Sequence, residues 1–300
     1  MNLTIDFETR SRADLKKTGP WVYGSHSSTQ VLCLSVKVGK EPSCLWLPSF
    51  TYGWLPMGHG LPIMTADRLV EIISEAEEVE AHSAEFEQAI WHHVMVRRHA
   101  FPEIPLNKWR CSAARAAMCS LPRSLGEACS VLGLATQKDM EGKRIMMKMC
   151  KPQKSKKTVM HEGQKASVTS EHWHEDPADF VKLCRYCLQD TEAEHDLSRA
   201  LPPLPPNELA IWRVDQLINR RGLLVDVDSA QAMVRAIADY EVKLLAEFRG
   251  ITQGKLSSPK KIQAFLEYLK TEFGVELDDL RKNTVVDALK DLEDEDEEGS

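Results

Sequence analysis

The sequence predicts an α/β fold, in which helices flank a mixed β-sheet, followed by a mostly α-helical segment. Up to about residue 200, short apolar runs rich in β-branched residues alternate with stretches of helical spacing. Beyond that point only helical spacing continues. The change coincides with a cluster of four prolines at 201–206, which stops a helix and forms a stiff spacer. We therefore expect one domain at 1–203 and a second at 204–300.

The first domain begins with a short apolar run at 3–9 that is typical of a buried strand. The next strands are expected at 31–38, at 43–47 as its hairpin partner, and at 78–81. Helical spacing is found at 65–77, 84–98, 111–118, 124–132, 140–150 and 177–200. The polar stretch 151–173 has neither period and is expected to be a mobile loop.

In the second domain, Asn207 is expected to cap a helix at 208–221, which Gly222 ends. Further helices are expected at 229–248, 259–273 and 279–292. The acidic tail 291–300 should be solvated and frayed, because seven of its first eight residues are Asp or Glu.

The bulk composition indicates a cytoplasmic protein, in the host cytoplasm if the source is viral. The apolar fraction of 43% is ordinary, and no stretch approaches the roughly 18 apolar residues of a membrane span. The first residues lack the basic and apolar regions of a signal peptide, and the eight cysteines have no paired spacing. The net charge of −7 disfavours simple electrostatic binding of nucleic acid, although 143–157 is basic and suits local phosphate contacts.

Two acids stand out in the first strand, because Asp6 and Glu8 are two residues apart in an otherwise apolar run. Residues i and i+2 of a strand point to the same face. Two buried carboxylates side by side repel each other unless something neutralises them. A hard divalent cation does so with oxygen ligands, often together with substrate phosphates. The pair therefore predicts a metal site for phosphoryl chemistry.

Two further segments supply partners for this pair. In 82–87 a helix is expected to begin, with Ser83 as its cap and Glu85 and Glu87 in the first turn; acids there also simply complement the helix dipole. In the helix at 177–200, Tyr186 and Asp190 are four residues apart and share one face, although packing alone also explains such a pair.

Together the three segments resemble one known family. The runs Ile5-Asp6-Phe7-Glu8-Thr9, His82-Ser83-Ala84-Glu85-Phe86-Glu87 and Tyr186-Cys187-Leu188-Gln189-Asp190 are similar to the three motifs of DEDDy-type 3′–5′ exonucleases. The closest resemblance is to the proofreading domain of bacteriophage-type family A (DNA polymerase I-like) enzymes. The second motif departs from the family, which often has Asn where Ser83 stands and usually Asp where Glu87 stands. The resemblance implies a ribonuclease H-like sheet for the first domain.

The resemblance also implies a reaction, the two-metal hydrolysis of the 3′-terminal phosphodiester of DNA with release of nucleoside 5′-monophosphates. Asp6 would bridge two Mg²⁺ or Mn²⁺ ions, with Glu8 and Asp190 completing one site and Glu87 holding the second ion through water. Tyr186 would orient the attacking water, since a phenol with a pKa near 10 is a poor base.

The substrate would be a single-stranded DNA 3′ end. Its bases need a stacking surface and its phosphates need cations. Phe7 and Phe86 adjoin the acids and could wedge the terminal base, although core packing is favoured for Phe7. The further substrate-binding candidates are Thr9, His82, Ser83, Lys148 and Lys151.

Beyond the prolines, 207–226 resembles the entrance to the polymerase region of these enzymes, and 256–262 resembles a segment of their thumb helices. The polymerase acids should lie further downstream, so this chain alone is not expected to polymerise, and its partner would be a polymerase domain in cis or in trans. Two alternatives stay open. One is a stand-alone exoribonuclease of the same superfamily. The other is a non-catalytic fragment that binds DNA or a replication partner.

Overall fold

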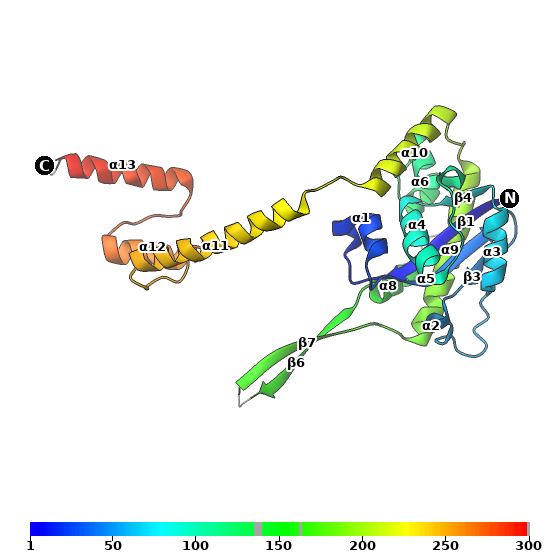
Figure 1. The fold of residues 1–300 in the computed structure, drawn as a ribbon, viewed down its shortest axis with the longest axis horizontal. Helices are drawn as coiled ribbons and strands as arrows, with labels where there is room; N and C mark the ends of the chain where they lie inside the picture. The colour runs from blue at the N-terminus through cyan, green and yellow to red at the C-terminus, as the bar shows by residue number, and fades with distance from the viewer. Residues whose placement is uncertain (135–139, 162–163, 299–300) are drawn as a thin grey trace. The chain divides into compact units, whose positions relative to one another are not determined.

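The computed structural model describes residues 1–134, 140–161 and 164–298. Its contacts divide the chain into two units, 1–222 and 223–300, called unit 1 and unit 2 below. The two units are coloured along the chain in Figure 1 and are described separately. The helix that follows the prolines belongs to unit 1, whereas the functional boundary expected at residue 203 stays a prediction.

Unit 1 is built on a mixed five-stranded sheet with the order β3-β2-β1-β4-β5. The central strand β1 (Asn2–Arg10) pairs antiparallel with β2 (Gln30–Val38) and parallel with β4 (Glu78–Ala81). The edges are β3 (Cys44–Trp46), antiparallel to β2, and β5 (Trp109–Cys111), parallel to β4. The expected strands are therefore present, β5 in addition, and the sheet is the mixed, helix-flanked arrangement of a ribonuclease H-like fold (Figure 1).

The two faces of β1 have different coverings, because its side chains alternate. Ile5 and Phe7 belong to a core cluster with residues of α3 (Ala66–Glu75) and of the segment after β4. The opposite face meets α9 (Pro177–Ala200), whose Cys187 Sγ lies 3.5 Å from the Asp6 carbonyl and whose His195 Nδ1 lies 3.4 Å from Thr4 Oγ1. The even-numbered residues of β1, which include the two acids, therefore face α9.

The helix expected at 84–98 consists of α4 (Glu85–Ile90), a π-helical stretch (Trp91–Val96) and α5 (Arg97–His99). The remaining expected helices of unit 1 are present, the one at 177–200 with the expected bounds and the others with shifted ends. Sequence reasoning missed α1 (Leu15–Ser25), in which Gly19 is non-helical and Pro20 follows it, so the helical pattern is interrupted. The other short helices are α2 (Ser49–Tyr52), a 3₁₀ turn (Leu106–Lys108), α6 (Ser112–Met118), α7 (Leu125–Val131) and α8 (Met140–Met149).

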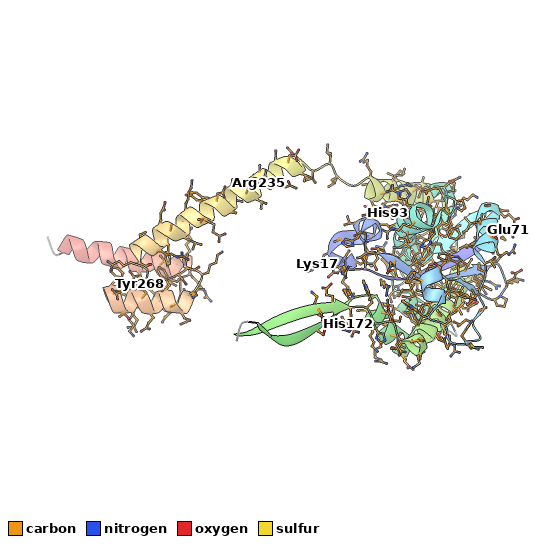
Figure 2. All side chains as sticks on the ribbon, turned by 60° about the horizontal axis from the view of Figure 1, so that its bottom comes forward. Lys17, Glu71, His93, His172, Arg235 and Tyr268 are labelled. Atoms are coloured by element: carbon orange, nitrogen blue, oxygen red, sulfur yellow. The ribbon has the colours of Figure 1, made fainter. Side chains whose placement is uncertain are left out.

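The prediction of a mobile loop at 151–173 is wrong. This stretch forms a separate two-stranded antiparallel sheet of β6 (Gln153–His161) and β7 (Gln164–His172), whose last residue is labelled in Figure 2. A hydrophobic alternation marks a strand only where one face is buried, and this polar hairpin lies outside the main sheet. Its end is held at Trp173, whose ring lies 4.7 Å from the guanidinium carbon of Arg10 on β1.

Two cap predictions are also wrong. The helix after the prolines, α10 (Pro206–Arg221), begins one residue before Asn207, with Pro206 in its first turn, where a missing N–H costs nothing. Gly222 ends it as expected, with φ 68°. Ser83 does not cap α4, because its own backbone has φ 69° and Ala84 takes the cap position without a side-chain bond.

Unit 2 consists of α11 (Val227–Ile251), α12 (Ile262–Phe273) and α13 (Lys282–Glu298), where helices were expected. Side chains along α11 and α12, among them Arg235 and Tyr268, are drawn in Figure 2. Neither helix has a buried residue, although Phe248 and Phe265 place their rings 5.8 Å apart. Within the described parts of both units, no helix has the length and apolar character needed to cross a membrane.

Candidate active site

Of the two acids of β1 that lie beside α9, Glu8 is buried and Asp6 is half-buried. Glu8 is 8% exposed. Burial, and secondly the nearby Asp190 carboxylate, raise the pKa of Asp6 to about 7. Burial raises the pKa of Glu8 well above its usual range, and the charges of Asp6 and Asp190 add to this effect. Strand alternation thus places the pair on one face, as predicted, and Asp190 lies close enough to act on both.

Tyr186 and Asp190 lie one turn apart on α9 and hydrogen-bond to each other. Burial and the adjacent Asp190 charge raise the pKa of Tyr186 above its ordinary value. The phenol therefore stays protonated at neutral pH and can orient a water but not deprotonate it. The predicted common face is present, and it is directed towards the acids of β1.

Glu87 reaches the same region from α4. It is 4% exposed, and its Oε2 has no hydrogen-bond partner. Burial, followed by the charge of Asp6, raises the pKa of Glu87 well above its ordinary value. A buried carboxylate oxygen with no partner is costly, so this atom is a position where a ligand or ion would be stabilising.

A cavity of about 320 Å³ opens beside these acids. Its lining brings together several predicted residues from β1, α4 and the stretch after α8: Asp6, Phe7, Glu8, Thr9, Phe86, Glu87 and Lys151. Phe7 is 4% exposed and packs beside Trp91, which agrees with the core role favoured for it. Thr9 Oγ1 is 2.9 Å from the Tyr23 hydroxyl.

The remaining predicted residues lie outside this lining. Lys148 forms an ion pair of 2.9 Å with Asp179. His82 has its two ring nitrogens 2.9 Å from Ser112 Oγ and 2.8 Å from the Arg123 carbonyl oxygen. Ser83 lines a second cavity of about 380 Å³, which shares Phe86 with the first.

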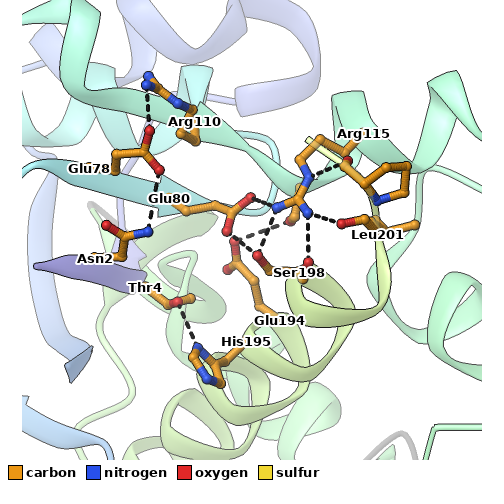
Figure 3. Close-up of polar contacts among 12 residues, drawn as sticks. Asn2, Thr4, Glu78, Glu80, Arg110, Arg115, Glu194, His195, Ser198 and Leu201 are labelled. Atoms are coloured by element: carbon orange, nitrogen blue, oxygen red, sulfur yellow. Dashed lines mark hydrogen bonds and ion pairs between the residues drawn. The ribbon is translucent and has the colours of Figure 1, made fainter. Parts of the chain in front are cut away.

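Sequence reasoning missed a further buried acid near this site, Glu194 on α9, which is 1% exposed. Its Oε1 lies 3.1 Å from Ser112 Oγ. Figure 3 shows it beside the ion pair of Glu80 and Arg115, at 2.7 Å, which Ser198 also joins. The available signal was its position one turn after Asp190, on the face that Tyr186 also occupies.

The donor set can be compared with what a cation requires. Among the described residues, no three His, Cys, Asp or Glu side chains converge closely enough to enclose an ion. The acids are nevertheless all oxygen donors, they raise one another's pKa, and one oxygen of Glu87 is unpartnered. These properties fit a hard divalent cation such as Mg²⁺ or Mn²⁺ better than a softer metal.

Comparisons with known proteins agree with this picture at a coarser level. No protein-family model matches the chain. The chain is 28% identical over 298 residues to a DNA polymerase of Bacillus phage SP02. The match covers 98% of this chain and 42% of the phage protein, so the chain spans about two fifths of the length of this curated relative. This similarity relates nearly the whole chain to one part of a phage DNA polymerase.

Proposed function

We propose that unit 1 is a metal-dependent 3′–5′ exonuclease that removes nucleotides from the 3′ end of single-stranded DNA and releases nucleoside 5′-monophosphates. The observation that carries the proposal is that Asp6, Glu8 and Glu87 line one cavity, while the charge of Asp190 acts on the first two. Buried like charges at one point are expensive unless they serve to bind cations. The spacing of the three motifs, which resembles that of DEDDy-type exonucleases, supports the same function.

The residues divide into two roles. Asp6, Glu8 and Asp190 would hold one cation and Glu87 a second, and bound cations would stabilise the charge that develops on the attacking and leaving oxygens. Tyr186 keeps its proton and is held by Asp190, so its hydroxyl is fixed to orient a water. Phe86 and Phe7 contribute apolar walls to the cavity beside the acids.

The single-stranded DNA would enter over the basic side of the cavity. Lys151 lines it, with half of its side chain exposed and only a loose contact of 4.0 Å to Asp14. Such a lysine is available to a phosphate. Phe86 is shared by the two cavities, which makes it the candidate for a contact with the terminal base.

The similarity to part of a phage DNA polymerase supports proofreading as the biological setting, with a polymerase domain as partner in cis or in trans. In this setting DNA, and not RNA, is the substrate. The match covers less than half of the relative's length, so we do not extend the proposal to polymerase activity of this chain.

The test is digestion of labelled single-stranded DNA with Mg²⁺ or Mn²⁺. Asp6→Asn and Asp190→Asn should each abolish release of 5′-monophosphates, far beyond the about 10–100-fold loss typical of a residue that only supports a ligand. Asp67→Asn, at an exposed position on α3, is the matched control and should keep full activity. A parallel RNA digest that ran faster would favour the exoribonuclease alternative, and full activity in both site variants would refute the assignment.

A further inference from the structure

The buried acid Glu194 belongs to a path of hydrogen-bonding groups that connects three elements. Glu194 lies on α9, Ser112 is the first residue of α6 and is fully buried, and His82 begins the loop between β4 and α4. Ser112 Oγ is 3.1 Å from Glu194 Oε1 and 2.9 Å from His82 Nδ1. The backbone of His82 also hydrogen-bonds to the Glu194 carboxyl group. The path therefore joins the helix of Asp190 to the loop that leads to Glu87.

The positions of the hydrogens follow from the far end of the path. His82 Nε2 faces a carbonyl oxygen, that of Arg123, at 2.8 Å, and must therefore donate. In a neutral imidazole Nδ1 is then the acceptor, and Ser112 gives its single hydroxyl hydrogen to it. Ser112 can now only accept from Glu194, so the path is complete when the Glu194 carboxyl carries a proton and donates it.

The alternative arrangement places a positive His82 against a negative Glu194 within the same buried path. The surroundings disfavour both charges. Burial lowers the pKa of His82 and raises that of Glu194 well above its ordinary value, and the latter rises further because Glu80, Glu87 and Asp6 are acids. The cation of this network, Arg115, is already paired with Glu80 and bonded to Ser198 (Figure 3).

We propose that Glu194 is an uncharged positioning residue that, with Ser112 and His82, fixes α9 against the loop before α4 and so sets the spacing between Asp190 and Glu87. The inference rests on the proposed exonuclease function for its consequence, but not for its geometry. It assigns Glu194 a role different from the other buried acids, which would be ionised when they hold cations. Partners that orient metal ligands typically change metal affinity or activity about 10–100-fold when removed.

The decisive experiment compares two substitutions of one residue. Glu194→Gln keeps the shape and can donate to Ser112 as a protonated carboxyl does, so kcat on single-stranded DNA should stay within about threefold of the parent. Glu194→Leu removes the path, and kcat and Mn²⁺ affinity should fall about 10–100-fold with little change in KM. Ser112→Ala, a smaller change at the middle of the path, should move the same two quantities in the same direction. Asp196→Leu and Asp196→Asn, at an exposed site two residues further along α9, are the controls.

A second readout does not depend on activity. The infrared difference spectrum between the metal-free protein and its Glu194→Gln variant at pH 7 should contain the band of a protonated carboxyl group. Carboxylate bands in that spectrum, or an inactive Glu194→Gln protein with a normal fold, would overturn the proposal and make Glu194 a charged ligand. An active Glu194→Leu protein would also overturn it. If the parent protein digests no DNA, the exonuclease function fails, while the spectrum still decides the state of Glu194.

Discussion

Unit 1 buries acidic side chains, whereas unit 2 exposes apolar ones. In unit 1, Glu8, Glu87 and Glu194 are almost inaccessible. In unit 2, α11 and α12 leave large apolar residues such as Met233 and Ile237 more than half exposed. Burying an ionisable group is costly, and groups with strongly shifted pKa values cluster at binding and catalytic sites. The function of this chain is therefore to be sought in unit 1.

The difference should be large in the energetics of single substitutions. Phe180, in the first turn of α9, is fully buried with its ring centroid 5.3 Å from that of Trp54, so Phe180→Ala should lower the free energy of unfolding by about 3–5 kcal/mol. The counterpart in unit 2, Ile237→Ala on α11, should change it by no more than about 0.5 kcal/mol, because the side chain is 66% exposed.

Urea titration measures both changes, and the tryptophans separate the units. All seven, at 21, 46, 54, 91, 109, 173 and 212, lie in unit 1, so their fluorescence follows this unit alone, whereas circular dichroism at helical wavelengths follows both. Equal losses for the two variants would mean that the apolar face of α11 is covered in solution, and the comparison of the units would no longer hold.

The contrast between the units also shows what sequence can predict. Asp6 with Glu8, and Tyr186 with Asp190, were placed correctly on common faces because strand and helix periodicity are local properties. The helices of unit 2 were expected for the same reason. The buried carboxyl group of Glu194 has a hydrogen-bond partner in Ser112, which is 82 residues away in the chain. No local pattern in the sequence indicates such a contact. The predictions of a loop at 151–173 and of a cap at Ser83 were wrong for a similar reason. Neither a polar hairpin nor a residue with positive φ produces a hydrophobic period in the sequence.

A second prediction concerns pH and metal in unit 1. Folding raises the pKa of Asp6 from 3.8 to about 7, so between these values the folded state retains a proton that the unfolded chain releases. The contribution of this Asp6 proton to the stability of the folded state is complete below about pH 4 and declines as the pH rises to about 7. In a chelator, the unfolding temperature followed by tryptophan fluorescence should therefore be lower at pH 8 than at pH 5.

Addition of Mn²⁺ at pH 8 should restore that temperature, since an ion replaces the missing protons. Asp6→Asn removes one of the titrating groups and should flatten the pH dependence, while the matched variant Asp67→Asn should leave it unchanged. A chelated protein that is more stable at pH 8 than at pH 5 would show that these acids are already neutralised by other means.

The smallest expected effect lies at the start of the hairpin in unit 1. Lys151 lines the cavity of the acids. Lys154 is exposed, and its Nζ forms an ion pair with Glu171 Oε1 over a long distance of 3.6 Å. If both contact phosphates, the double variant Lys151→Gln/Lys154→Gln should reduce the slope of log affinity against log salt for single-stranded DNA by about 1.4, at about 0.7 per contact. The measurement uses fluorescence anisotropy with Asp190→Asn in every protein, so that no DNA is digested.

The double variant Lys40→Gln/Lys108→Gln removes the same charge from the turn after β2 and from the segment before β5, and its slope should match that of the parent. This control separates a local phosphate contact from the effect of net charge, which the two double variants change equally. An equal fall in slope for both would assign DNA attraction to overall charge. The strand path would then have to be sought at the second cavity, where Arg123 and Trp212 combine a cation with an aromatic ring.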